Sequence, residues 1–254
     1  MFIDSHAHLI LESFDNDRDE VIQQAFSNEV THIVQSCDNL EEIKGNLSLC
    51  KRYNNIYSSV GIHPHEAKLW NGVSYDTIVE YTNDKKVVAI GETGLDFYYN
   101  LSPKEEQILV FREQIRIAKK ASLPIIIHCR DAFNEAMSIL KEEKPECGGV
   151  FHCYTGDLDT AKKAIDLGFY ISWSGIITFK NAINLKDIAK EIPLEKTLIE
   201  TDCPFLTPVP YRGKRNEPKF VKLVAEELAK IHVKDIKEIA NITSSNARKL
   251  FGIK

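Results

Sequence analysis

The chain has 254 residues, of which 43% are hydrophobic and 27% are charged, and its formal net charge is −5. These proportions are typical of a soluble globular protein, and the acidic balance excludes a global basic field that would attract a polyanion. A nucleic-acid partner would therefore need a local basic patch. Because a length near 250 residues is ordinary for an α/β barrel and no Pro/Ser-rich linker interrupts the chain, we predict one domain over 1–254.

The cysteines and the apolar runs indicate a compartment. The six cysteines form no C-x-x-C pair, which is typical of reduced thiols in an intracellular protein. No basic region followed by an apolar stretch opens the sequence, and no apolar run approaches the ~18 residues that a membrane span needs. We therefore expect a cytoplasmic protein without a membrane partner.

Short apolar runs rich in β-branched residues recur along the chain and predict eight strands. Several are almost continuously apolar, as parallel strands buried on both faces tend to be. The predicted strands are 2–4, 31–37, 56–62, 87–92, 124–129, 148–153, 169–174 and 197–202.

Charged segments with helical periodicity lie between and after these runs. The segment 102–121 opens with Ser102 as the expected N-cap and Pro103 at the first helical position. The segment 159–168 ends in Gly168, where a glycine would terminate a helix. Further helical patterns cover 17–28, 218–230 and 234–250.

Strand and helix alternate along the whole length, which predicts right-handed β-α-β units and a parallel sheet. Eight strands with eight crossovers favour a closed (β/α)8 TIM barrel, and a doubly wound open sheet is the alternative. The longest segment without a pattern is the loop 203–218. Loops of that length in compact domains are usually functional.

The predicted strands end in residues that bind metals or carry out acid-base chemistry. In a barrel of this kind the active site is built at the C-terminal ends of the strands. Each such residue alone has an ordinary structural explanation, but their joint occurrence at one mouth favours a metal site, because converging buried charges without a metal are costly. The six candidates are His6, His8, Glu92, His128, His152 and Asp202, and His63 and His65 follow the third strand.

Four imidazoles and two carboxylates exceed the three protein ligands of a catalytic zinc site. Two ions about 3.5–4 Å apart, bridged by a carboxylate and a water, fit this set better. The thiols of Cys129, Cys153 and Cys203 each follow a candidate ligand directly. Because residue i+1 of a strand faces away from residue i, we expect all three to be packing residues.

The ordered motifs of this chain resemble those of the TatD-like metal-dependent deoxyribonucleases, a branch of the amidohydrolase superfamily. The resemblance covers the whole chain. It is carried by "DSHAHL", "GIHPH", "AIGETGLDF", "PIIIHCRDA", "FHCYTG", "SWSGIITFK", "IETDCPFLTPVPYRGKRNEP" and "NARKLF".

The resemblance implies a metal-ligand set and an activity. One divalent ion would be held by His6, His8 and Asp202, a second by His128 and His152, and Glu92 would bridge the two. Many related amidohydrolases bridge their metals with a carboxylated lysine, but the fourth strand offers Glu92 and no lysine at its tip. This departure speaks against a cyclic-amide or lactone hydrolase. Members of the family are described as nucleases that act on DNA from a 3′ end.

We predict Asp202 and Glu92 as the catalytic residues, with Asp202 orienting or deprotonating a metal-activated water. Arg130 would contact the phosphate as a bidentate donor, unless it forms a surface salt bridge with Asp131 or another acid. His63 would contact substrate or protonate a leaving group.

The loop 203–218 supplies an aromatic residue and several basic ones that suit a single strand by stacking and phosphate pairing. These predicted contacts are Tyr211, Arg212, Lys214 and Arg215. The alternative for this loop is a solvated segment, or one held down by Glu217.

The favoured function is a two-metal phosphodiesterase, specifically a 3′-5′ exonuclease on single-stranded DNA. The alternatives are a two-metal hydrolase of a small ester, lactone or amide, and a non-catalytic binding protein. Zinc, magnesium and manganese all suit the donor set. DNA ends are the expected partner, and we expect a monomer with no obligate protein partner.

Overall fold

Eight strands form one parallel sheet in the order of the sequence, from β1 to β8. This computed structural model describes all residues, 1–254. Each predicted strand is present, although several boundaries differ. The strands are β1 (Phe2–Ala7), β2 (Val30–Gln35), β3 (Ile56–Val60), β4 (Val87–Asp96), β5 (Ile125–Arg130), β6 (Gly149–Phe151), β7 (Tyr170–Trp173) and β8 (Thr197–Ile199).

The sheet closes between its first and last strands. Ala7 forms a parallel bridge with Cys203. The His8 amide donates to the carbonyl of Cys203 at 2.8 Å, and the Asp202 amide donates to the carbonyl of His6 at 2.9 Å. These bonds join β1 to the segment after β8, so the predicted (β/α)8 TIM barrel is confirmed and the open sheet is excluded.

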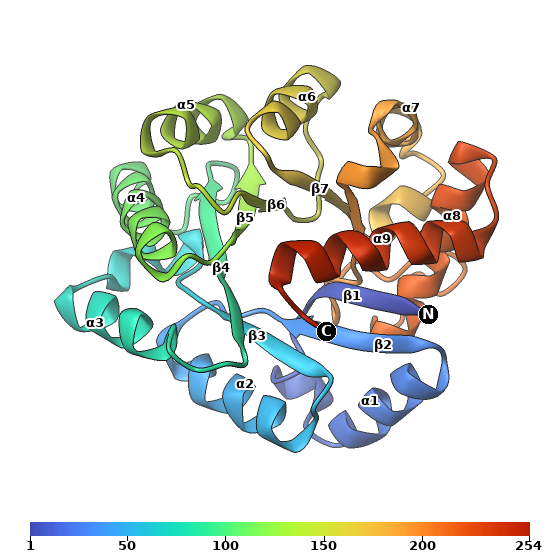
Figure 1. Ribbon diagram of the computed structural model, residues 1–254, viewed down its shortest axis with the longest axis horizontal. Coiled ribbons are helices and arrows are strands. Elements are labelled where there is room, and N and C mark those ends of the chain that lie inside the picture. Colours follow the sequence, from blue (N-terminus) through green and yellow to red (C-terminus); the bar gives the residue numbers. More distant parts are fainter.

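Helices surround the strands, and a helix with the same number follows each of the eight strands along the chain (Figure 1). The α-helices are α1 (Arg18–Ser27), α2 (Leu40–Arg52), α3 (Gly72–Tyr81), α4 (Lys104–Ala121), α5 (Phe133–Glu143), α6 (Leu158–Asp166), α7 (Ile183–Glu191), α8 (Val221–His232) and α9 (Ile236–Phe251). Short 3₁₀ helices span Glu12–Phe14, Pro64–Leu69, Gly175–Thr178, Leu194–Lys196 and Pro218–Phe220. None of the helices is both long and apolar enough to cross a bilayer.

The start of α4 differs from the sequence prediction. The helix begins at Lys104, and the N-cap position is held by Pro103 with no side-chain cap. The Ser102 hydroxyl instead donates to the carbonyl of His65 at 2.7 Å and accepts from the Lys68 amide at 3.1 Å. A tertiary contact thus overrides the local capping preference and ties α4 to the loop that carries the histidines after β3.

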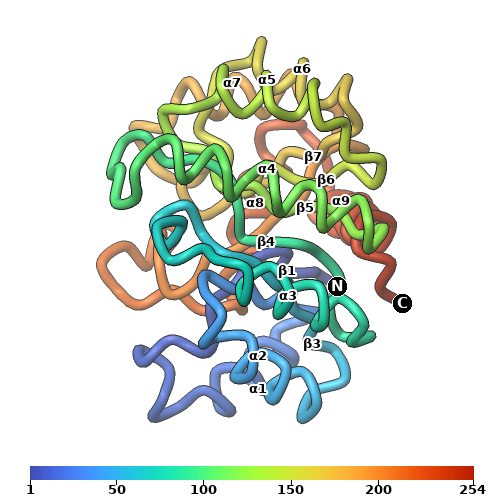
Figure 2. Tube along the Cα trace, turned by 90° about the vertical axis from the view of Figure 1, so that its left-hand side faces the viewer, coloured from blue at the N-terminus to red at the C-terminus, as the bar shows by residue number.

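The N-terminal end of the barrel is sealed by the last helix. Eleven buried residues form a cluster separate from the large core between strands and helices. Eight of them come from strands around the barrel, and they pack against Ala247, Phe251 and Ile253. Figure 1 shows α9 lying across the strands, with the two chain termini close to each other. In Figure 2 the loops project on the side opposite the termini, so the two ends of the barrel differ in construction.

Candidate metal centre

The structure brings the six candidate ligands together at the C-terminal end of the barrel. Five of them line a cavity of about 800 Å³, and the remaining one, His6, is fully buried. His6 belongs to β1 and His8 follows it, Glu92 lies in β4, His128 in β5, His152 directly after β6 and Asp202 after β8.

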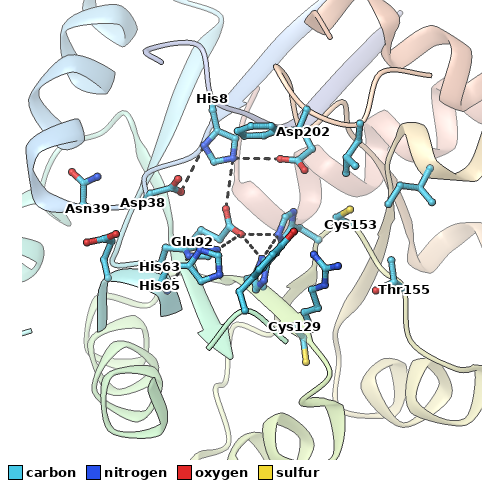
Figure 3. Close-up of a pocket in the computed structure, with 18 of the residues that line it drawn as sticks. His8, Asp38, Asn39, His63, His65, Glu92, Cys129, Cys153, Thr155 and Asp202 are labelled. Atoms are coloured by element: carbon cyan, nitrogen blue, oxygen red, sulfur yellow. Dashed lines mark hydrogen bonds and ion pairs between the residues drawn. The ribbon is translucent and has the colours of Figure 1, made fainter. Parts of the chain in front are cut away.

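The carboxylate of Glu92 lies at the centre of this group, and its two oxygens face different histidines (Figure 3). Oε1 lies 2.8 Å from His152 Nε2 and 3.0 Å from His128 Nδ1. Oε2 lies 3.0 Å from His6 Nε2 and 3.7 Å from His8 Nε2. One carboxylate therefore divides the imidazoles into two pairs, as a carboxylate that bridges two cations would.

Asp202 approaches the pair formed by His6 and His8 from the other side of the cavity. Its Oδ1 lies 3.4 Å from His8 Nε2 and 3.8 Å from His6 Nε2. The buried carboxyl of Asp4 holds the preceding residue, because its Oδ1 accepts from the Thr201 amide at 2.8 Å. Burial raises the pKa of the Asp4 carboxyl to about 8, although its hydrogen bonds with Thr201 oppose that rise. The backbone then turns at Asp202 with a φ of +56°, which directs the side chain into the cavity.

A second carboxylate, Asp96, lies behind His128 and was not predicted from the sequence. Its Oδ2 lies 3.0 Å from His128 Nε2 and 3.0 Å from His65 Nε2. A histidine that donates one ring N–H to a carboxylate presents its other nitrogen to a metal. Asp96 thereby leaves Nδ1 of His128 facing Glu92. The only sequence signal was its place in the stretch that carries Glu92, four residues earlier on the same strand.

Glu200 plays the same part for His152, and Asp38 lies near His8 at ion-pair distance without a hydrogen bond to it. Glu200 Oε1 lies 3.3 Å from His152 Nδ1 and accepts from the Cys153 amide at 2.8 Å. Asp38 Oδ1 lies 3.6 Å from His8 Nδ1. Both rings therefore present Nε2 to the cavity. Glu200 lies two residues before Asp202, so strand alternation could have placed it on the same side.

The pKa values in this cluster show that its charges depend on one another. Burial by itself would raise the pKa of the Glu92 carboxyl, but the charges of His152 and His6 hold it well below its usual value. Burial by itself would lower the pKa of His8, but Asp38 and neighbouring carboxylates raise it to about 10. Without metal, protons on the imidazoles supply the positive charge that the buried carboxylates need.

The donor atoms fit divalent cations. Each of three residue groups offers one nitrogen or oxygen atom per residue, all within 4.8 Å of one another. Nitrogen and carboxylate donors suit zinc, and the carboxylates also suit magnesium or manganese. The groups are His6, His8 and Glu92; His6, His152 and Asp202; and His63, Glu92 and His128.

His63, which the sequence suggested as a substrate contact, lies among these ligand groups. Its Nε2 is 3.4 Å from Glu92 Oε1, and its Nδ1 accepts from the His65 amide at 3.1 Å. Burial lowers the pKa of His63. The neutral ring therefore carries its proton on Nε2, directed toward the metal cavity.

One of the three cysteines expected to be packing residues, Cys153, lies outside the hydrophobic core and lines the cavity. Cys203 is fully buried in the core, and Cys129 belongs to the same core although it also borders the cavity. At Cys153 the backbone has left β6 and adopts a φ of +42°, so strand alternation no longer applies. Burial raises the thiol pKa of both Cys129 and Cys153, and neither thiol belongs to the groups of clustered donor atoms.

Comparison with known proteins identifies the family. A family model described as TatD related DNase matches residues 3–252. The chain belongs to this family. It is a metal-dependent hydrolase of the TatD type.

Relatives of this TatD-family protein span its whole length. It is 46% identical to the Bacillus subtilis protein named uncharacterized metal-dependent hydrolase YabD, covering 100% of both chains. It is 36% identical to the Salmonella typhimurium protein named 3′-5′ ssDNA/RNA exonuclease TatD, covering 98% of both. The crystal structure of the TatD homologue YjjV from Escherichia coli superimposes with a TM-score of 0.95 at 29% identity, covering 100% of this chain and 98% of that one.

Arg130 lies at the wall of the metal cavity of this TatD-family protein. Its guanidinium carbon lies 4.0 Å from the ring centroid of Tyr98 and 4.6 Å from that of Tyr99. The neighbouring Asp131 is exposed and forms no ion pair with it. The alternative of an Arg130–Asp131 salt bridge is therefore absent from the structure.

The predicted loop contacts do not line the metal cavity. Tyr211, Lys214 and Arg215 line a separate hollow of about 670 Å³. Arg215 forms an ion pair with Asp17 at 2.6 Å and one with Glu217 at 3.2 Å. Carboxylates therefore hold this end of the loop, and one of them is Glu217, as the alternative prediction for the loop expected.

The remaining basic residue of the loop stacks on an aromatic ring. The guanidinium carbon of Arg212 lies 3.8 Å from the ring centroid of Phe179. This position leaves the charge of Arg212 outside the group of residues around the metal cavity.

Proposed function

We propose that this protein hydrolyses phosphodiester bonds with two divalent ions, as a 3′-5′ exonuclease on single-stranded DNA. The observation that carries the proposal is the division of the four imidazoles between the two oxygens of Glu92. Two-metal sites of this kind are typical of phosphatases and nucleases. The relative named as an exonuclease covers 98% of this chain at 36% identity, which supports the substrate class.

The residues that would hold the ions are those of the metal centre. His6, His8 and Asp202 would hold one ion, His128 and His152 the other, and Glu92 would bridge them. Zinc, magnesium or manganese would lower the pKa of a water and draw charge from a phosphate oxygen when bound. The carboxylates of Asp96 and Glu200 fix which ring nitrogen of His128 and His152 faces the cavity.

The protein's own groups would handle the proton and the leaving oxygen. Asp202 Oδ1 accepts a proton from the attacking water, whose oxygen forms a bond to phosphorus as the P–O ester bond breaks. His63 directs an Nε2–H into the cavity and can donate to the phosphate or to the departing oxygen. Arg130 lies at the same wall, where a guanidinium can donate two parallel hydrogen bonds to a phosphate.

A hydrolase of a small ester, lactone or amide is the second candidate, and the charge of the cavity favours it. The basic residues of the loop, which argued for a polyanion, lie outside the metal cavity. Six carboxylates line that cavity, with Arg130 as the only arginine or lysine: Asp38, Glu42, Glu66, Glu92, Asp131 and Asp202.

An activity panel distinguishes the two candidates. The chelated protein would be reloaded separately with zinc, magnesium and manganese, then given 3′-labelled and 5′-labelled oligonucleotides, bis(p-nitrophenyl) phosphate and p-nitrophenyl acetate. The proposal predicts phosphodiester cleavage that begins at the 3′ end and disappears on chelation. Ester hydrolysis with no phosphodiester cleavage in any metal would reject it.

Elemental analysis tests the bridge itself. Glu92→Gln should weaken both metal sites together, because each carboxylate oxygen faces one of the two histidine pairs. A Glu92→Gln protein that still held two ions at full occupancy would remove the bridging role.

A further inference from the structure

We propose that the single strand is held between two exposed aromatic rings on opposite sides of the metal centre, Tyr99 and Phe205, with its phosphate received by Arg130. The inference rests on the proposed nuclease function and adds to it a nucleotide-binding subsite. It also moves the stacking site away from Tyr211, where the sequence suggested it.

The two rings flank the metal cavity. Both line it, and both are large aromatic side chains left about half exposed, at 53% for Tyr99 and 52% for Phe205. Tyr99 follows β4 and Phe205 follows β8, which are four strands apart in an eight-stranded barrel and therefore opposite each other. The Tyr99 ring lies 5.7 Å from His65, and the Phe205 ring lies 6.1 Å from His8.

Each ring is anchored through its backbone to the metal centre. The Tyr99 amide donates to Asp96 Oδ1 at 2.8 Å, and the other oxygen of that carboxylate holds His128. The Phe205 amide donates to the carbonyl of Asp202 at 2.9 Å. A single hydrogen bond thus fixes the main chain of each aromatic residue relative to the metal centre.

The guanidinium of Arg130 is free to receive an anion. It forms neither a hydrogen bond nor an ion pair with any group of the protein. Its contacts are cation–π interactions with the rings of Tyr98 and Tyr99. Stacking on aromatic faces holds a guanidinium in place without using its N–H donors. Its donors can therefore bind a phosphate beside a base stacked on Tyr99.

The charge around the mouth indicates where the phosphates run. Asp38, Glu42 and Glu66 line the cavity on the side of the segments that follow β2 and β3. A phosphate chain would be repelled there and attracted toward Arg130, which ends β5 and has one exposed carboxylate, Asp131, beside it. The backbone of the strand therefore lies over the β4–β5 side of the mouth.

The ring of Tyr211 in the loop is less exposed than those of Tyr99 and Phe205, at 38%. Tyr211 stacks on Phe220 with centroids 4.7 Å apart and an interplanar angle of 20°, so one of its faces is already covered. It does not line the metal cavity. Tyr211 is therefore the matched control for Tyr99 and Phe205.

The test compares Tyr99→Leu and Phe205→Leu with Tyr211→Leu in the whole protein. Binding of a 5′-labelled dT decamer with a non-cleavable phosphorothioate at its 3′ linkage and 2-aminopurine at its 3′ end is measured by anisotropy on the metal-loaded protein. Cleavage of the matching phosphodiester decamer is measured under the same conditions. Loss of one base–aromatic stack should raise the dissociation constant and KM about tenfold, and the double variant about a hundredfold, since stacking contributes ~1–3 kcal/mol per base. The quenching of 2-aminopurine fluorescence on binding should be weaker in these variants than in the wild type.

Turnover at saturating substrate should stay within about threefold of wild type, because only uniform binding is lost. Tyr211→Leu, Tyr99→Phe and Phe205→Tyr should bind within about twofold of wild type, since the last two retain an aromatic face. If the wild type binds and cleaves the decamer while Tyr99→Leu and Phe205→Leu match it, the subsite is rejected and the proposed nuclease function stands. If the wild type cleaves no phosphodiester, both fail.

Discussion

At the N-terminal end of the barrel, Ile3, Val88 and Ile126 pack with Phe251 and Ile253 of the C-terminal segment. At the C-terminal end, the same strands carry imidazoles and carboxylates within 4 Å of one another. The first end gains free energy from burial of apolar surface, at about 25 cal/mol per Å². The second end buries charges, which costs free energy unless each has a partner.

The two ends of the barrel therefore serve different purposes, one for stability and the other for chemistry. Apolar packing near α9 holds the strands together regardless of what happens at the mouth. The metal centre can then keep an arrangement of buried charges that is unfavourable without cations. In it, the charges of His152 and His6 oppose the rise in the pKa of Glu92 that burial would cause. Asp38 and neighbouring carboxylates raise the pKa of His8 to about 10. Substitutions at the two ends should therefore change different measured quantities.

The largest expected effect is at the mouth. Asp202→Asn should lower turnover of an oligonucleotide by about 10³-fold, because it removes the group that orients and deprotonates the water. The protein should keep one ion, since His128 and His152 remain, and its free energy of unfolding should not fall. Steady-state kinetics with elemental analysis would check this, and near wild-type turnover would contradict the role of Asp202.

At the opposite end, Phe251→Ala should lower the free energy of unfolding by about 3–5 kcal/mol, as truncation of a buried phenylalanine does. Phe251 is buried in the cluster that seals the barrel. Turnover per folded molecule should not change. Urea unfolding would measure the loss, with Leu109→Ala as the control because Leu109 is exposed. Equal losses in both variants would show that the seal adds nothing particular to stability.

The third prediction tests whether a carboxylate that lies behind a metal ligand, without being a ligand itself, contributes to metal affinity. Asp96→Asn should weaken metal affinity about 10–100-fold, because the carboxylate behind His128 fixes the ring and raises its basicity. Competition with a chelating dye would measure it. Asp131→Asn, an exposed carboxylate at the same mouth, should leave affinity unchanged. Identical affinities for both variants would mean that Asp96 only supports the turn at Tyr98 and Tyr99.

The smallest expected effect is at the loop. Hydrogen bonds from Arg215 lower the pKa of the Asp17 carboxyl, so the pair stabilises the folded protein above the usual carboxyl pKa and stops doing so as pH falls through the lowered value. Asp17→Asn should lower the free energy of unfolding by at most about 0.5 kcal/mol at pH 7, because the pair is solvent-exposed. Thermal melts should show the difference at pH 7, and the difference should shrink steadily as the pH falls below the usual carboxyl pKa. If the stability difference between wild type and Asp17→Asn increased as the pH was lowered, the ion pair between Asp17 and Arg215 would be contradicted.

Several elements could be predicted from the sequence because their signals are local. Eight apolar runs alternating with helical patterns were enough for a parallel barrel, since connections between parallel strands follow few topologies. The candidate ligands could be recognised because each stands where a predicted strand stops, and the C-terminal ends of all strands in a barrel meet at one mouth. The motifs around them are also sufficient to indicate the family.

Other features depended on contacts between distant segments. Ser102 binds the loop after β3 instead of capping α4, and Cys153 turns into the cavity at a positive φ, so local rules placed both wrongly. The basic loop carried the right composition for a nucleic acid, yet Arg215 is held by Asp17, nearly two hundred residues away in sequence.

The sequence by itself determined the barrel, the six residues at its mouth and the family, because periodicity and strand-end position are properties of short segments. Only the tertiary structure decided how Glu92 divides the histidines between its two oxygens, which carboxylates stand behind them, and which aromatic rings are open to a strand. Each of these depends on distances of a few ångströms between side chains from different strands, and such distances are set by closure of the barrel rather than by any one segment.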